Sequence, residues 1–277
     1  MSTRDNLHRW LAPVSAAAWA DLEEEARRTF RRHAAARKVA DVPEPEGPGL
    51  ASVGTGRSSP AAPPGQEVIA RVRESVPLVE LEVPFVLARE EVDAVERGAQ
   101  DADWQPVKDA VKAMALAEDR AAFEGYGAAG FTGIVQGSSN APVPLPESVR
   151  EFPDAVGRAL RVLREEGVGG PYALLLDADA YTAVSDTSIH GYPVRDHLKE
   201  LVDGGVIWAP ALGGGLLVSL RGGDFELRLG EDLSIGYLDH DATRVRLYLR
   251  ETLAFLMHTA EASVALPSGE APDKGGA

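Results

Sequence analysis

Cysteine is absent from this chain of 277 residues, and basic residues are scarce. Without cysteine the chain has no disulfide, no thiol nucleophile and no thiolate metal site. The absence of cysteine does not indicate whether the protein works in an oxidising or a reducing compartment. Lys and Arg number 28 against 43 Asp and Glu, which gives a formal net charge of −15 at pH 7. Because a nucleic-acid binder neutralises phosphates with a basic surface, this balance argues against nucleic acid as a partner.

Long apolar runs are also missing. The longest uncharged stretch, residues 125–146, contains five glycines and three prolines, which argues against a membrane-spanning helix. Asp5 stands where a signal peptide would have its apolar core, so we expect a cytoplasmic protein without a membrane partner. The 44% hydrophobic and 26% charged residues are typical of a globular protein with a sizeable core.

Three long amphipathic helices are predicted. Over residues 15–38, the apolar residues Trp19, Leu22, Ala26 and Phe30 recur at steps of three and four, which indicates one buried helix face. Two further helices are expected over residues 103–124 and 148–166, and glycines end both of them.

The segment between the first two helices differs sharply in composition. Residues 41–65 are rich in proline and glycine, which predicts a long loop or extended arm. The β-like stretches 68–73 and 78–87 follow it, so we expect a projecting hairpin. A lone hairpin is marginally stable in water, and such an arm should therefore rest on a partner.

The second half of the chain alternates between short helices and strands. The expected elements are strand 172–176, helix 177–184, loop 185–193, helix 194–202 and strands 206–208, 216–220, 225–229 and 245–257. Interleaved helices and strands indicate the α+β class. From Pro267 onward the sequence is a tail with nothing to bury.

Motifs that carry chemistry are few. The sequence contains no phosphate-binding loop, and residues 137–140 lack the closing glycine of a nucleophile elbow. Residues 239–241 (Asp-His-Asp) form the only dense cluster of potential metal ligands, but neighbouring side chains of a strand or loop point in different directions. We therefore predict no catalytic residues, no metal site and no enzymatic activity.

One region resembles a known family closely. Residues 221–227 (Arg-Gly-Gly-Asp-Phe-Glu-Leu) and 229–237 (Leu-Gly-Glu-Asp-Leu-Ser-Ile-Gly-Tyr) resemble the signature of family 1 encapsulin shell proteins, formerly called linocin- or bacteriocin-like. Further matches occur in order at residues 6–9, 11–13, 103–109, 117–120, 170–172, 191–193, 207–212 and 251–253. The resemblance spans about residues 5 to 266 and is greatest for the actinobacterial branch.

The resemblance implies the HK97 phage-capsid-like fold, with a peripheral domain, an axial domain and an extended arm (the E-loop). The expected divisions are 1–42 (N-terminal helix segment, lumenal side of the peripheral domain), 43–90 (arm), 91–127 (peripheral domain with its spine helix), 128–223 (mainly axial domain), 224–266 (peripheral strands) and 267–277 (disordered tail). Copies of such a chain close into an icosahedral shell, with roughly 60 copies in the smallest shells of the family.

The resemblance also implies a binding site. Shells of this family enclose an enzyme by binding its C-terminal targeting peptide, and the matching positions are Phe30, Arg37 and Asp41 with Leu233, Ile235 and Tyr237. An apolar groove would anchor leucine-like side chains, while Arg37 and Asp41 set the orientation. The alternative is that Phe30 and Ile235 are ordinary core residues. The expected cargo is a dye-decolourising peroxidase, which the actinobacterial likeness favours, or a ferritin-like protein.

A second implied site is a pore at the fivefold axis. Its loop comprises Asp186, Thr187, Ser188, Ile189, His190, Gly191 and Tyr192. The alternative is a mobile surface loop without a filtering role.

Other features of the family, or other classes of protein, are less favoured. Some relatives bind flavin at a tryptophan after the arm, but residues 88–91 contain none, so we expect no cofactor. A phage-type major capsid protein would share the fold, yet a chain of charge −15 lining a lumen repels DNA. A hydrolase or peptidase would need a convergent catalytic site, which the sequence does not supply.

Overall fold

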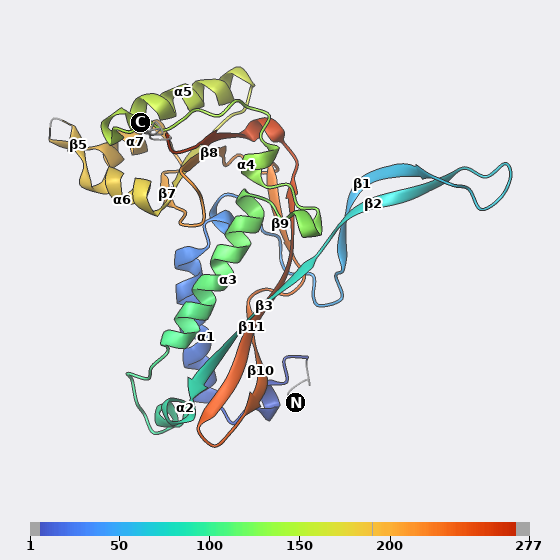
Figure 1. Cartoon of the computed structure of the whole chain (residues 1–277), viewed down its shortest axis with the longest axis vertical. Coiled ribbons are helices and arrows are strands. Elements are labelled where there is room, and N and C mark those ends of the chain that lie inside the picture. Colours follow the sequence, from blue (N-terminus) through green and yellow to red (C-terminus); the bar gives the residue numbers. More distant parts are fainter. Residues whose placement is uncertain (1–5, 190, 270–277) are drawn as a thin grey trace, which may run out of the picture.

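Residues 6–189 and 191–269, which the computed structural model describes, form two sheets with helices packed around them and one projecting ribbon (Figure 1). The α-helices are α1 (Ala16–His33), α2 (Arg89–Glu96), α3 (Gln105–Phe123), α4 (Ile134–Gly137), α5 (Phe152–Glu165), α6 (Ala178–Asp186) and α7 (Val194–Leu201). The 3₁₀ turns are η1 (Arg9–Leu11), η2 (Ala36–Lys38), η3 (Gly127–Ala129), η4 (Val149–Glu151) and η5 (Ala260–Ala262). None of the helices described is long and apolar enough to cross a membrane.

The strands divide between the two sheets, the ribbon and a small hairpin. They are β1 (Ser52–Ala61), β2 (Ala70–Pro77), β3 (Val79–Ala88), β4 (Tyr172–Leu176), β5 (Ser188–Ile189), β6 (Tyr192–Pro193), β7 (Val206–Trp208), β8 (Gly215–Ser219), β9 (Phe225–Leu229), β10 (Ser234–His240), β11 (Arg244–Met257) and β12 (Ser263–Leu266). This mixture of helices and strands confirms the predicted α+β class.

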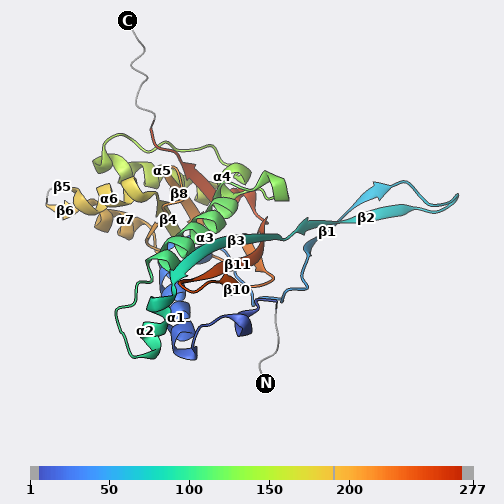
Figure 2. The ribbon, with the colours of Figure 1, turned by 60° about the horizontal axis from the view of Figure 1, so that its bottom comes forward.

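The first sheet is antiparallel, in the order β10–β11–β3, and β9 pairs with the far end of β11. Along β11 the inward residues Val245, Leu247 and Leu249 are fully buried, because α1 and α3 lie side by side against this face (Figure 2). The period-two pattern of the sequence thus becomes one buried and one outward face of the sheet.

The second sheet has the order β12–β8–β4–β7, and α5, α6 and α7 pack around it (Figure 1). Every residue of β4 is buried, as expected for a short central strand. The position of β12 differs from the expectation. Residues 263–266 were assigned to the peripheral strands 224–266, but they pair with β8, since the chain crosses back to this sheet after β11.

The projecting ribbon is built differently from the predicted hairpin. Residues 41–65 were expected to form a long loop or an extended arm without a strand, yet β1 lies within them and pairs with β2, from Ser52↔Pro77 to Ala61↔Ala70. A register shift between Gly54 and Ser58 accommodates the glycines, and Gly56 has a φ of 76°. The stretch predicted as the second hairpin strand is β3, which pairs with β11 in the first sheet.

Helix α1 is also shorter than the predicted 15–38. It begins at the Ser15 cap, whose hydroxyl accepts a hydrogen bond from the Ala18 N–H at 3.2 Å, and it ends at His33. Farther along, the carboxylate of Asp119 accepts the N–H groups of Ala35 at 2.9 Å and Ala36 at 2.8 Å. Those amides therefore cannot continue the helical ladder, and the chain turns into η2.

The start of the predicted tail is paired. Ser268 forms a bridge with Leu145, and the Gly269 N–H donates to the Leu145 carbonyl at 3.1 Å. Residues 270–277 of that tail lie outside the described residues.

Candidate functional site

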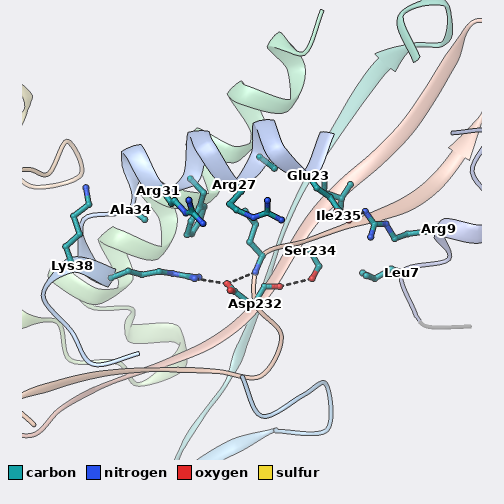
Figure 3. Close-up of a pocket in the computed structure, with 14 residues that line it drawn as sticks. Leu7, Arg9, Glu23, Arg27, Arg31, Ala34, Lys38, Asp232, Ser234 and Ile235 are labelled. Carbon is teal, nitrogen blue, oxygen red and sulfur yellow. Dashed lines mark hydrogen bonds and ion pairs between the residues drawn. The ribbon is translucent and has the colours of Figure 1, made fainter. Parts of the chain in front are cut away.

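A groove of about 690 Å³ lies between α1 and the start of β10 (Figure 3). Its lining residues are Leu7, Arg9, Glu23, Ala26, Arg27, Phe30, Arg31, Ala34, Arg37, Lys38, Asp232, Leu233, Ser234 and Ile235. Four of the six predicted peptide-binding positions, Phe30, Arg37, Leu233 and Ile235, are among them. The structure thus brings the predicted positions near α1 (Phe30 and Arg37) together with those at the start of β10 (Leu233 and Ile235), so that each pair lines one wall of the groove.

The floor of the groove is apolar. Ala26, Phe30 and Ala34 stand four residues apart and therefore share one face of the helical segment, opposite Leu233 and Ile235. Phe30 is 5% exposed and Ile235 4% exposed, and both also belong to the core beneath the groove. Phe30 and Ile235 are therefore core residues that also line the groove. The role in peptide binding and the role as ordinary core residues do not exclude each other.

The rim carries more basic than acidic side chains. Apart from Arg37, it comprises Arg9, Arg27, Arg31 and Lys38 against Glu23 and Asp232. Arg9 Nη2 lies 2.5 Å from Glu23 Oε1, whereas Arg31 and Lys38 have no ion-pair partner in the part of the chain that the structure describes. On a chain of net charge −15, this groove is a local basic surface.

Arg37 is held by carboxylates of the chain itself. Its guanidinium donates to Glu118 at 2.6 Å, to Asp232 at 2.6 Å and to Glu251 at 3.2 Å, and its Cζ lies 4.5 Å from the Phe30 ring centroid. Burial lowers the pKa of Arg37, but the charges of Glu118 and the other two carboxylates outweigh burial and raise that pKa above its ordinary value. Arg37 is therefore a charged link between the groove and the interior.

Two of those carboxyl groups have no exposed surface. Burial raises the pKa of Glu118, and Arg37 opposes the rise. Burial and the neighbouring Glu118 charge together raise the pKa of Glu251 well above its usual range. Because one guanidinium cannot offset two buried negative charges, we infer that this pair keeps a proton to a higher pH than a free carboxyl group does. Burial also raises the pKa of Asp119 to about 7, against the hydrogen bonds from Ala36 and Ala35.

Asp41 and Tyr237 do not line the groove. The carboxylate of Asp41 accepts the N–H of Gly223 at 2.6 Å, so it holds the turn before β9. The hydroxyl of Tyr237 lies 2.6 Å from His240 Nδ1, beyond the groove along β10. The family resemblance had implied Asp41 as a peptide-binding position on the helix side, but α1 ends at His33 and Asp41 lies beyond it.

Several groove residues were not predicted from the sequence. Ala26, Arg27 and Ala34 are three or four residues from Phe30, which is one helical turn, and that spacing could have identified them. Arg31 directly follows Phe30 and has no such signal. Leu7, Arg9 and Asp232 reach the groove only through tertiary folding.

The predicted pore loop forms a small hairpin after α6. Ser188 pairs with Pro193 and Ile189 with Tyr192, while His190 lies outside the described residues. Gly191 has a φ of 83°, which allows the tight turn. The Tyr192 ring lies 4.6 Å from that of His197, and its hydroxyl donates to Glu200 at 3.2 Å, so the hairpin is fixed to α7.

Metal ligands do not gather in the part of the chain that the structure describes, where no group of three or more His, Asp or Glu side chains could hold an ion. In the predicted cluster at residues 239–241, the two aspartates bind different partners and do not point to a common site. Asp239 pairs with Arg246, whereas Asp241 accepts the N–H groups of Thr243 and Arg244 in the next turn.

Comparison with known proteins identifies the family. A family model described as "Encapsulating protein for peroxidase" matches residues 4–254. The type 1 encapsulin shell protein of Mycobacterium tuberculosis is 58% identical over 262 residues, which are 95% of this chain and 99% of that protein. This chain belongs to the type 1 encapsulin shell protein family. The Rhodococcus erythropolis member of this family is 56% identical, over 94% of this chain and 99% of that protein.

Solved structures confirm the expected fold. A virus-like particle from Pyrococcus furiosus superposes with a TM-score of 0.63 and 16% identity, over 89% of this chain and 98% of that chain. The capsid of Myoviridae phage XM1 gives a TM-score of 0.52 and 10% identity, over 84% and 90%. The encapsulin-family chain thus has the HK97-type capsid fold.

The buried pair predicts how stability depends on pH. The folded chain keeps a proton that the unfolded chain releases, so this contribution is present at low pH and is lost as pH rises from about 4.5 through the raised pKa of Glu251. We expect Glu251→Gln, which needs no proton, to gain Tm relative to the parent protein as pH rises from about 4.5 toward alkaline values. Each unit of raised pKa corresponds to about 1.4 kcal/mol, or roughly 3–6 °C in Tm.

Thermal melts followed by intrinsic fluorescence across this pH range measure the difference. Asp232→Asn is the matched control, because it removes a half-exposed carboxylate beside the same Arg37, and we expect a nearly constant offset. A Glu251→Gln offset that is equally constant with pH would contradict a proton held by the pair.

Proposed function

We propose that this chain assembles into a closed icosahedral shell of roughly 60 copies that encloses a cargo enzyme in the cytoplasm. The 58% identity to a type 1 encapsulin shell protein over 95% of the chain carries the proposal. The same identity favours a compartment shell over a phage capsid, since phage structures match only in fold. The role of the chain in this proposal is structural, and the cargo performs the chemistry.

The ribbon of β1 and β2 supports the assembly. It projects from the side of the molecule, and at its tip Ile69 is 90% exposed and Val72 61% exposed (Figures 1 and 2). Arg57, Arg71 and Arg73 on the same ribbon have no ion-pair partner among the described residues. Apolar and basic side chains without partners on an acidic chain fit a contact with a neighbouring copy.

Assembly should therefore depend on the tip of the ribbon. We expect Ile69→Asp to abolish megadalton particles, because it places a carboxylate in the proposed contact, while the folded chain keeps its Tm. Size-exclusion chromatography with light scattering measures particle mass. Glu67→Gln, at the same tip, is the control and should assemble. Intact shells of Ile69→Asp would contradict a role of the tip in assembly.

The groove is the proposed site for the C-terminal targeting peptide of the cargo. Its apolar floor suits leucine-like side chains, and its lining contains four of the six peptide-binding positions expected from the family resemblance. The family model described as encapsulating a peroxidase supports a dye-decolourising peroxidase as the cargo, ahead of a ferritin-like protein. Arg37, which lines the groove, acts as a positioning residue, because its guanidinium is already paired.

Substitutions along β10 test this site. We expect Leu233→Asp to reduce the cargo per shell at least about tenfold, since it puts a charge on the groove floor, without preventing assembly. Leu238→Asp is the control, because Leu238 is 45% exposed and lies outside the groove. Mass spectrometry of purified particles identifies and counts the cargo. Equal loading of both variants would place the peptide elsewhere.

The hairpin of β5 and β6 is the proposed rim of a fivefold pore. Asp186 is exposed at the end of α6, directly before the hairpin, so five copies would form a ring of negative charge. Rings of side chains at a constriction select permeating molecules by charge and size.

Charge reversal tests the pore. We expect Asp186→Lys to slow oxidation of a cationic dye by the enclosed peroxidase and to speed that of an anionic dye of similar size. Asp179→Lys, at the exposed start of the same helix, is the control. Unchanged rates for both dyes would show that this loop does not filter substrates.

A further inference from the structure

Strand β10 is an edge strand. Among the described residues it pairs with β11 along one side, and no strand lies along its other side. An open edge presents backbone N–H and C=O groups that can pair with another extended chain. The groove borders this open edge, because Leu233, Ser234 and Ile235 belong to its wall.

The direction of the backbone groups follows from one hydrogen bond. The backbone N–H of Tyr237 donates to the Leu7 carbonyl at 2.9 Å, so the backbone of residue 237 points this N–H away from β11. Antiparallel pairing alternates along a strand, and Ile235, two residues earlier in the same uninterrupted register, turns its N–H and C=O the same way. Gly236 between them faces β11.

The segment around Leu7 shows that this edge accepts another chain. Leu7 is close enough to β10 for a backbone hydrogen bond, and it also closes one end of the groove (Figure 3). Toward Ile235 the same edge borders the open volume of about 690 Å³. The site at Ile235 is therefore a continuation of an edge that the protein already uses.

We propose that the groove binds an extended peptide that adds as a further strand to the free edge of β10 at Ile235. Every second side chain of the peptide faces the apolar floor at Phe30, and the basic rim at Arg31 and Lys38 favours acidic groups in the flanking residues. The inference rests on the proposed function, which makes the occupant the targeting peptide of the cargo. It adds that recognition uses the backbone as well as side chains.

Ile235→Pro tests the backbone contact. Proline is compatible with an edge strand where the lost N–H faces away from the ladder, so shells should still assemble. We expect cargo per shell to fall roughly tenfold below that of Ile235→Ala, which loses side-chain volume but keeps the N–H. Ile235→Val should load like the parent protein.

Two results separate the inference from the proposed function. Equal loading of Ile235→Pro and Ile235→Ala would overturn strand addition and leave peptide binding in the groove intact. Full loading of Leu233→Asp shells would overturn the groove itself and, with it, this inference.

A measurement on the unchanged protein covers the case in which Ile235→Pro fails to fold. Hydrogen exchange is compared between parent shells produced with and without cargo, with fragmentation that resolves single amides. We expect exchange at Ile235 to slow at least about tenfold in loaded shells. Gly236, whose N–H already faces β11, serves as the internal control and should not change. Unaltered exchange at Ile235 in loaded shells would overturn the proposal.

Discussion

The position of the groove depends on one partly buried arginine whose carboxylate partners Glu118 and Glu251 are fully buried. Arg37 comes from η2 and reaches Glu118 on α3, Glu251 on β11 and Asp232 before β10. A single guanidinium thus joins the turn after α1, the long helix α3 and the sheet. Breaking such a buried pair leaves an uncompensated charge and is strongly destabilising, by about 3–5 kcal/mol in comparable cases. Because separating these charges is so unfavourable, the ion pairs of Arg37 hold the two walls of the groove at a fixed distance from each other.

The packing around Arg37 also explains how core residues can form the floor of the proposed peptide-binding groove. Phe30 and Ile235 are buried against α3 and β11, so their side chains have little freedom left to lose when a peptide covers them. The exposed basic side chains of α1 lie beside a rigid floor, whereas the charge of Arg37 in the groove lining is already neutralised by carboxylates. Affinity then comes from a preorganised apolar surface, and charge contributes to orientation and approach.

The sequence predicted this architecture where local patterns decide it. The stripe through Phe30 predicted α1, and alternating residues predicted β11. The strand β1 was missed, because its proline and glycine residues resemble a loop until pairing with β2 and a glycine bulge make them a strand. The predicted helix over residues 15–38 was too long, because α1 ends at His33 and Asp119, 84 residues from Ala35, accepts the N–H of Ala35. Long-range hydrogen bonds of this kind leave no local signal.

The surfaces proposed for assembly and for cargo binding are joined by one sheet. Strand β2 ends at Pro77 and β3 begins at Val79, so the ribbon is a direct extension of the strand that pairs with β11. On its other side β11 pairs with β10, whose free edge borders the groove. A substitution that loosens β11 should therefore impair both functions, whereas changes at the ribbon tip or at the β10 edge act on one function each. The ladder of β3, β11 and β10 is thus the common scaffold of the two binding surfaces.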